Sequence, residues 1–397
     1  MAYSVTSWFI DQTRLKFTTP KRKFTIAGSD YSSRVIRWPS IRRSATDIRP
    51  ANISVDLANE DLAMNFFLSE PTKLLSTYDL SMGYTHPSSG DELITMFTGQ
   101  IDKIMYKNGV VTIQTLDKFK QFTERSVGSS NSATLYTGSN YLPSDIAWWL
   151  CTSYGGLSSI QSTSNPDIDY SLFSQWANVF SSDSVFIQAR FEGSKVTESL
   201  RKIARYTDSG IWVEGNKINF VRFSEAGSME TVVTDDDIIN ITLSLDDSRI
   251  VNKQHVYADY DTTSSYWKLD IFDVDSTSVN SYGLREEIEK DESVWYVSSA
   301  TALNMAQRRV LFSSTPYQEY DLTLPLVTLP RQIGEMVRIS DNFFGVTSID
   351  AWRIMEYSLN MDNGQMMVKA DSSRIAQPFI LDHDVHGLLD QNYNFLL

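Results

Sequence analysis

Apolar and polar residues alternate along the first third of the chain, in short segments separated by turn residues. The alternating segments are residues 24–38, 51–59, 78–84, 93–106 and 110–117. A period of two residues is typical of strands that bury one face. Residues 1–128 are therefore predicted to form a β-barrel or sandwich.

Two hairpins with Asn-Gly turns lie about 250 residues apart, at Asn108-Gly109 and Asn363-Gly364. Asn-Gly favours a type I′ turn, whose two central residues both need positive φ. At both places the predicted order is strand, connection, strand, Asn-Gly, strand. With the turns aligned, three apolar pairs coincide: Phe97 with Trp352, Ile104 with Leu359, and Tyr106 with Met361.

The match between the hairpins is imperfect, because the second returning strand is one residue shorter and Ile101 meets Glu356. Two interpretations remain. The hairpins are either unrelated parts of a β-rich chain or two copies of one β module. The duplicated module is the preferred hypothesis.

The pattern becomes helical in residues 129–225, after a Ser/Gly-rich connection. Ile146, Trp149 and Leu150 share a helical face between Pro143 and Gly155. A clearer helix follows, which Ser194 is expected to cap and which ends before Gly210. Its apolar face consists of Val196, Leu200, Ile203 and Ala204. A hairpin is expected at Gly215-Asn216. These residues predict a mixed α/β insertion.

Strand patterns return from about residue 240, and one more helix is expected from Ala300 to Phe312. Its predicted face holds Leu303, Ala306 and Val310, with Ser298 or Ser299 as cap. The second hairpin closes the β region near residue 374. Residues 375–397 have no clear period and are interpreted as a tail that docks on a partner.

The predicted fold class is mainly β with α+β insertions: two β-barrel domains and two smaller inserted domains. The expected boundaries are a first barrel over 1–128, completed by about 226–248; an insertion over 129–225; a second barrel over 249–275 and 315–374; a small helical insertion over 276–314; and a C-terminal tail over 375–397.

Composition supports a globular, strand-rich protein. Hydrophobic residues make up 42% and aromatic residues 12% of the 397 positions. No apolar run approaches the ~18 residues of a membrane span, and the N-terminus lacks a signal-peptide pattern. The single Cys151 excludes an internal disulfide and a cysteine-based zinc site. A protein made in the cytoplasm is expected.

Charge is distributed unevenly around a net value of −14. Residues 1–50 contain ten Lys or Arg and three Asp, so the rest of the chain carries −21. The basic segment either forms a patch for an acidic partner or nucleic acid, or pairs with acidic surface of the same chain or a neighbouring copy; the second interpretation is preferred. Stable duplex DNA binding is not expected from an acidic chain.

No catalytic, cofactor-binding or metal-binding residue is predicted, and the chain is not expected to be an enzyme. It has no P-loop, GxGxxG, HExxH, GxSxG or CxxC motif. Three acidic or His-containing segments do not match the spacing of a known site: His383 and His386 with Asp382 and Asp384, the loop from Asp273 with Ser278 where a calcium loop needs Gly, and residues 235–237. A carboxylate pair of a glycosidase has no local signature, so the sequence does not exclude one.

An ordered set of segments resembles the hub proteins at the tip of tailed-phage tails. Tyr282-Gly283 precedes a small helical insertion, and Gly334 to Val337 match a later Gly-Asp-x-Val element, with Glu335 in place of Asp. Residues 52–61 and 97–104 resemble the first barrel of such hubs. The relatives include hubs of gene transfer agents, contractile injection systems and type VI secretion spikes.

The resemblance implies a structural virion protein of the tail tip or baseplate, assembled in the host cytoplasm. Such hubs have two tube-like β-barrels per chain, and three chains present six barrels to the sixfold tail tube. The implied partners are two further copies, the tail tube or distal tail ring, a tip spike or fibre, and the tape-measure protein. DNA passes through the channel without stable binding, and an acidic wall would repel it.

Two other functions remain open at this point. One is a wall-degrading tip protein, since some hubs carry a fused hydrolase. The other is a carbohydrate-binding module that uses aromatic side chains as platforms, although such residues are more often core. The candidate platforms are Trp148, Trp149, Trp176 and Trp212.

Overall fold

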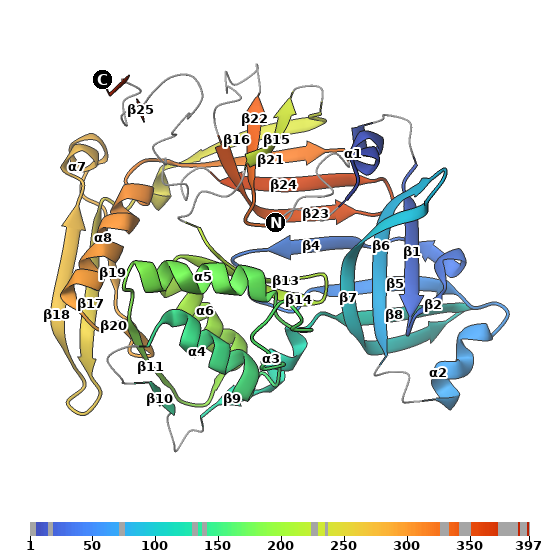
Figure 1. Cartoon of the computed structure of the whole chain (residues 1–397), viewed down its shortest axis with the longest axis horizontal. Helices are drawn as coiled ribbons and strands as arrows, with labels where there is room; N and C mark the ends of the chain where they lie inside the picture. The colour runs from blue at the N-terminus through green and yellow to red at the C-terminus, as the bar shows by residue number, and fades with distance from the viewer. Residues whose placement is uncertain are drawn as a thin grey trace.

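A computed structural model of the chain describes most of the sequence. The described residues are 5–14, 19–70, 76–128, 134–136, 141–223, 229–234, 237–325, 333–340, 351–371, 388–389 and 395–396. They form two curled seven-stranded sheets and a third, six-stranded sheet covered by helices (Figure 1). The predicted mainly β fold class is confirmed.

The first sheet uses strands from the N-terminal third, and buried side chains alternate with less buried ones along residues 52–58 and 110–116. In spatial order it contains β2 (Ser29–Asp30), β1 (Lys21–Ile26), β6 (Thr77–His86), β7 (Gly90–Lys107), β8 (Val110–Leu116), β5 (Asn52–Ala58) and β3 (Val35–Arg37). All neighbouring pairs are antiparallel. Alternation of period two in the sequence therefore predicted these strands correctly.

The second sheet is built from the C-terminal part of the chain and one N-terminal strand. Its order is β15 (Met229–Thr234), β22 (Met336–Ser340), β23 (Ala351–Asn360), β24 (Gln365–Asp371), β21 (Tyr317–Leu324) and β16 (Asn240–Asp246), with β4 (Ser40–Ser44) paired to β23. The inner faces of the first and second sheets share one hydrophobic core, which α1 (Ser7–Arg14) helps to cover.

The third sheet belongs to a separate core. It contains β10 (Thr134–Tyr136), β11 (Ile187–Phe191), β20 (Val294–Tyr296), β17 (Lys253–Asp261), β18 (Tyr266–Val274) and β19 (Glu286–Glu289). The helices of this region are α3 (Lys120–Glu124), α4 (Pro143–Trp149), α5 (Tyr170–Ser182), α6 (Val196–Tyr206), α7 (Ser276–Tyr282) and α8 (Ser299–Ser313).

Short pairings complete the described structure. They are β9 (Ser126–Val127) with β12 (Ser194–Lys195), β13 (Ser209–Glu214) with β14 (Lys217–Arg222), and β25 (Leu388–Leu389) with β26 (Phe395–Leu396). Helix α2 (Phe66–Ser69) lies in the connection from β5 to β6. The expected turn at Gly215-Asn216 joins β13 to β14, and both residues have positive φ.

Strand pairing differs from the sequence prediction in two places. Residues 249–275 were predicted to join the second barrel, but β17 and β18 pair within the third sheet. Residues 226–248 were predicted to complete the first barrel, but β15 and β16 pair with β22 and β21 of the second sheet. Local periodicity identifies a strand but carries no information about its distant partner.

The predicted helices α6 and α8 are present, but one capping residue and one buried position differ from the prediction. The predicted face of α6 is buried throughout, but the helix is capped at Lys195, whose backbone N–H donates to the Glu198 carboxylate at 3.1 Å, and not at Ser194. Ser298 caps α8 as expected, its Oγ accepting from Thr301 N at 3.2 Å. Leu303 was predicted to be buried but is exposed, and Met305 takes its place in the core.

Candidate functional site

The residues weighed in the sequence as metal or carboxylate sites do not come together as one. In the loop from Asp273, the Asp275 carboxylate accepts from Thr277 N and Ser278 N and so caps α7. Asp237 accepts from Thr234 in a turn. Asp235, Asp236, Asp382, His383, Asp384 and His386 lie outside the described residues. Within the described part of the chain, no group of three metal-capable side chains is close enough to hold an ion.

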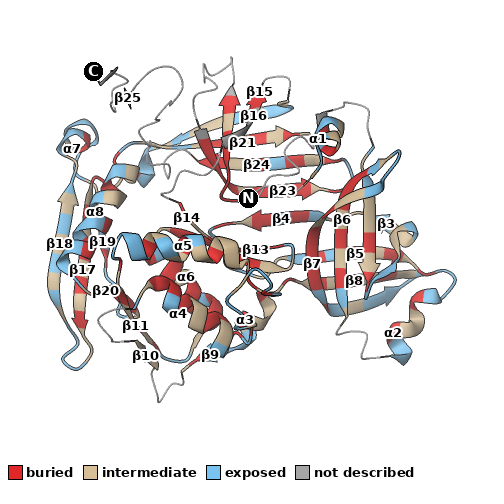
Figure 2. Cartoon of the chain, viewed as in Figure 1, coloured by how far each residue is buried: buried red, intermediate tan, exposed pale blue. Residues whose placement is uncertain are grey.

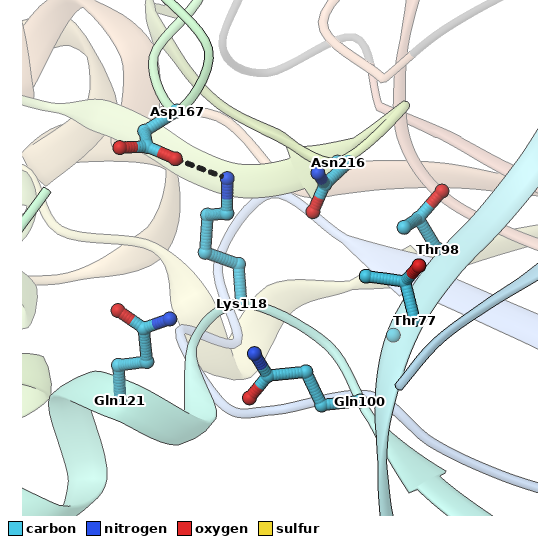
Figure 3. Close-up of a pocket in the computed structure, with 8 residues that line it drawn as sticks. Thr77, Thr98, Gln100, Lys118, Gln121, Asp167 and Asn216 are labelled. Atoms are coloured by element: carbon cyan, nitrogen blue, oxygen red, sulfur yellow. Dashed lines mark hydrogen bonds and ion pairs between the residues drawn. The ribbon is translucent and has the colours of Figure 1, made fainter. Parts of the chain in front are cut away.

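A polar pocket of about 180 Å³ lies between the first sheet and the inserted α/β region. Figure 3 shows the ion pair of Lys118 and Asp167 in this pocket, 2.6 Å from Nζ to Oδ1. The other lining residues are small or amide-bearing: Thr77, Thr98, Gly99, Gln100, Gln121 and Asn216. They come from β6, β7, α3 and the β13–β14 turn, so the pocket marks a domain junction.

Asp167 is held as an anion in this pocket. Burial opposes its ionisation, but hydrogen bonds from Lys118 and from Ser158 N at 2.7 Å outweigh that effect and lower the pKa of the carboxyl. It is the one carboxylate among the eight lining residues. Glycoside hydrolysis needs a pair of carboxylates, one with a raised pKa. The pocket lacks that arrangement.

The four tryptophans considered as sugar platforms pack inside the inserted region or at its boundary with the first two sheets. Trp176 and Trp212 are buried, and Trp176 Nε1 donates to Ser209 Oγ at 2.9 Å. Trp148 and Trp149 are half-buried and lie edge-on to Tyr170 and Tyr136 respectively. A platform needs an open ring face, so these side chains act as core.

The feature that organises the molecule is the chain segment formed by the consecutive strands β3 and β4, which runs from the first sheet to the second. β3 pairs with β5, and two residues later β4 pairs antiparallel with β23, with Ile41 opposite Leu359 and Arg43 opposite Tyr357. Figure 1 shows β21, β24, β23, β4, β5 and β8 stacked one below another. The two sheets are therefore joined side by side.

A buried polar cluster locks this joint. The Arg43 guanidinium donates to Asp117 Oδ2 at 3.1 Å and to the Met96 carbonyl at 3.3 Å, and it lies over the Phe97 ring. Both side chains of the pair are 2% exposed. On the adjoining strand, the Tyr357 hydroxyl donates to the Glu214 carboxylate at 3.0 Å. Three regions thus meet at one charge cluster: the two sheets and the β13–β14 hairpin.

Burial shifts the acid–base behaviour of this cluster. Desolvation raises the pKa of Asp117 to about 6, although Arg43 and two backbone N–H groups pull it down. The pKa of Tyr357 is also raised, by burial first and by the nearby Glu214 second. A buried charge whose partner is removed is costly, so this cluster fixes the position of β4.

Four strands in each of these two sheets follow the same plan. We call β5–β8 the first module and β21–β24 the second module. Their spatial orders are β6-β7-β8-β5 and β22-β23-β24-β21, and all pairs are antiparallel. A register shift falls between Ile101 and Lys103 of β7 and between Ile354 and Glu356 of β23. An identical strand order with a bulge at the same place supports the duplication hypothesis.

The hairpin turns of the modules differ, and this corrects the sequence alignment. Lys107 pairs with Val110, leaving a two-residue turn in which Asn108 and Gly109 both have positive φ. Asn360 pairs with Gln365, leaving a four-residue turn in which Gly364 but not Asn363 has positive φ. The prediction of a type I′ turn is wrong for the second hairpin. The pairing aligns Ile104 with Tyr357 and Tyr106 with Leu359, two residues away from the alignment by turns.

The face of the joined sheets opposite the core is polar. Figure 2 shows the alternation of buried and partly exposed residues along these strands. Its charges are largely paired: Lys369 lies 3.0 Å from both Glu319 and Asp321, and Arg42 lies 2.7 Å from Glu356. Most of the remaining positions carry hydroxyl, amide and single charged groups: Ser54, Asp56, Lys103, Gln114, Thr242, Ser244 and Ser358. Two exposed methionines, Met105 and Met367, also lie on this face.

The basic N-terminal segment pairs with acidic residues of the same chain, as the preferred interpretation holds. Arg42 and Arg43 bind Glu356 and Asp117, and Arg37 lies 3.7 Å from Asp362. Two of these three pairs link the N-terminal segment to the second module. Part of the positive charge in residues 1–50 thus serves the joint between the sheets, while Lys21 and Arg34 pair with Asp91 and Asp61 in the first third of the chain.

The motif residues behind the resemblance lie at element ends. Tyr282 ends α7 and Gly283 follows with a φ of 76°. Gly334 has a φ of 84° and leads into β22, and its N–H donates to the Ile354 carbonyl at 2.8 Å. The latter contact fixes the start of the second module.

Two solved structures share this fold over nearly their whole length. A tail protein from Neisseria meningitidis MC58 covers 89% of this chain and 97% of its own, with 12% identity and a TM-score of 0.57. The 43 kDa tail protein of prophage MuSo2 from Shewanella oneidensis covers 90% and 99%, with 14% identity and a TM-score of 0.56. The chain therefore has the fold of phage tail proteins, which confirms the resemblance seen in the sequence.

No family model and no curated protein sequence matches the chain. Similarity is thus detected through the arrangement of strands and helices. Among the described helices, none combines the length and the apolar composition that a membrane crossing requires.

Proposed function

We propose that the protein is a structural component of a phage-like virion, a homotrimeric hub at the distal end of the tail. The observation that supports this most directly is the pair of like modules joined side by side by β4. Three chains contribute six modules. A trimer of this kind matches a sixfold tube on one side and a threefold tip on the other.

The polar face of the joined sheets is proposed to line the channel. Hydroxyl, amide and paired charged groups give that face little net charge, so a passing polyanion finds no line of free cations to bind. This mechanism differs from the one expected from the net charge, in which an acidic wall repels DNA. Tape-measure protein and then DNA are the proposed occupants.

The remaining parts of the chain are proposed to face neighbouring tail proteins. The inserted regions carry the third sheet and its helices away from the joined sheets (Figure 1). A tail tube or distal tail ring would contact one end of the ring, and a spike, fibre or baseplate protein the other. Assembly would take place in the host cytoplasm, with no stable DNA complex.

A role as wall-degrading enzyme or sugar-binding module has no specific support from the described residues. The polar pocket holds one ionised carboxylate, and the four tryptophans lie in packed regions. We propose that the chain itself is not an enzyme. A zymogram on cell-wall material should show no clearing by the purified chain, and clearing that survives repurification would contradict this.

Light scattering and electron microscopy of the purified chain test the hub proposal. We expect a mass of three chains and a ring with six similar lobes around a threefold axis. The two modules should superpose after a rotation of about 60° around that axis. A chain that stays monomeric at all concentrations, or a ring of another symmetry, would overturn the proposal.

A further inference from the structure

Two equivalent strand edges in this molecule differ in what covers them. On β23, Tyr357 and Leu359 are 1% and 0% exposed, because β4 pairs along that edge. Their equivalents on β7 are Ile104 and Tyr106, which pair with the matching positions of β8. Tyr106 is 37% exposed although its hydroxyl donates to the Met64 carbonyl, and the neighbouring Met105 is also 37% exposed.

A second open edge lies at the other end of the joined sheets. Among the described residues, β16 pairs with β21 on one side and with no strand on the other. Leu243 and Leu245 face the same side as Tyr320, the core residue opposite Leu243 on β21. Leu243 is partly buried against the core, whereas Leu245 is 64% exposed. An apolar side chain on the inner side of an unpaired edge is typical of a strand whose neighbour is missing.

We propose that the edge of β7 from Lys103 to Lys107 pairs with β16 of a second copy of this chain. This inference rests on the proposed function and identifies the surfaces that join the copies. A pairing within the chain serves as the model for this contact, since β4 already pairs antiparallel with the equivalent edge of β23. The second copy is thus expected to supply β16 where this chain supplies β4.

Side-chain chemistry selects one register for this contact. Core-facing residues must meet core-facing residues across an antiparallel pair. Placing Tyr106 opposite Leu243 and Ile104 opposite Leu245 covers the most exposed apolar side chain of β16. The same register sets Lys103 opposite Asp246, so opposite charges meet on the polar face. A shift by two residues toward the start of β16 sets Lys103 opposite Ser244 and loses the charge pair.

The placement of the two edges allows the ring to close. They lie on different strands, β16 at the end of the second sheet beyond β21 and β7 next to β8 in the first sheet, so the contact is head-to-tail and each copy uses both edges. Contacts of this type form closed rings when the rotation per copy divides the circle, which is 120° for three copies. Pairing of every β7 with a neighbouring β16 leaves neither edge open.

Disulfide trapping on the polar face tests the register. Met105 and Ser244 are opposite each other in the proposed pairing, and opposite Cα atoms in an antiparallel pair lie about 4.5–5.5 Å apart, within disulfide range. The native Cys151 is buried and does not compete. The chain with Met105→Cys and Ser244→Cys should give covalent trimers on oxidation. The control with Met105→Cys and Thr242→Cys sets the thiols on a diagonal and should cross-link at least about tenfold less.

A charge variant tests the same edge without a cross-link. Leu245→Asp should weaken self-association by about tenfold or more, since the edge would bury a carboxylate. Leu311→Asp is the matched control, because Leu311 is 63% exposed but belongs to helix α8, which takes no part in the proposed strand pairing. Equal loss in both variants would count against the proposed contact.

The outcomes separate this inference from the proposed function. Trimers that cross-link through Met105→Cys and Ser244→Cys but not through the control pair support it. Trimers that do not cross-link, or that cross-link equally in both pairs, overturn the strand pairing and leave the trimeric hub standing. A chain that remains monomeric by light scattering overturns the hub proposal and this inference together.

Discussion

The first and second modules agree in their four central strands and differ in what is attached to them. β6 has ten residues and an antiparallel neighbour, β1, whereas β22 has five residues and a parallel neighbour, β15. The bulge, the strand order and the direction of each central pair are the same. The four strands that the modules share are therefore the ones that form the joined sheets. This indicates that the repeat is needed to join the modules side by side more than to build the core of each module.

The largest expected effect comes from breaking the cluster at that joint. Arg43→Ala leaves Asp117 buried without its cation, which should cost about 3–5 kcal/mol in the free energy of unfolding. Urea unfolding followed by tryptophan fluorescence measures this loss. The double variant Arg43→Met, Asp117→Leu removes both charges and should recover most of it. A single variant that loses less than ~1 kcal/mol would show that the charge pair is not what holds β4.

Replacing the turn glycine of each hairpin by valine should destabilise the two hairpins to different extents. Gly109 has a φ of 75° in a two-residue turn, and an added Cβ would meet only the Glu60 side chain, so the cost is conformational. Gly109→Val should lose about 1–2 kcal/mol or more, because a β-branched residue resists positive φ. Gly364→Val should lose less, since a four-residue turn can adjust. Gly109→Asn is the control, because Asn tolerates this conformation. Equal losses at Gly109 and Gly364 would mean that turn length does not matter.

The pH dependence of stability tests the buried carboxyl of the joint. The pKa of Asp117 is about 6 in the folded chain and near its ordinary value when unfolded, so the folded state binds this proton more tightly. Its contribution is fully present below about pH 4 and is lost as the pH rises through 6. Asp117→Asn should remove that part of the slope. The test compares urea midpoints of the two proteins from pH 4 to pH 7, and parallel curves would contradict the expected shift.

The smallest expected change in stability comes from a substitution on the polar face, at a position where the two modules differ. Lys369 of β24 pairs with Glu319 and Asp321, while the equivalent position of β8 is Gln114. Lys369→Gln makes the second module like the first and should cost less than about 1 kcal/mol, because these groups are partly exposed. Thermal unfolding at low and high salt measures it, and a difference that does not shrink with salt would point to packing instead of charge.

Much of the fold could be predicted from the sequence because it follows local rules. Strands β5 and β8 of the first module alternate cleanly, and α6 has a complete apolar face. What failed was the choice of partners for strands. β17 and β18 have the same local pattern whether they pair with the second module or with β20, and only the shape of the assembled core decides.

The joint between the two sheets was not predicted from the sequence, because the strand that forms it contains charged residues. The segment Ser40–Ser44 contains two adjacent arginines and looks like an exposed basic stretch, yet Ile41 and Arg43 both point into the core. Their spacing of two is the signal that could have revealed β4 as a strand. The partner Asp117 lies 74 residues away in the sequence, so the pairing that makes a buried arginine tolerable could not be seen locally.

The strand β4 also has a mechanical consequence. A polymer driven through a ring places the circumference under tension. Within a chain, that tension passes from β5 to β23 through strand hydrogen bonds and the covalent backbone between β3 and β4. In the proposed trimer, the tension between copies would pass through hydrogen bonds and side-chain contacts alone. Such a ring would open first at its three joints between chains and release each pair of modules as one piece.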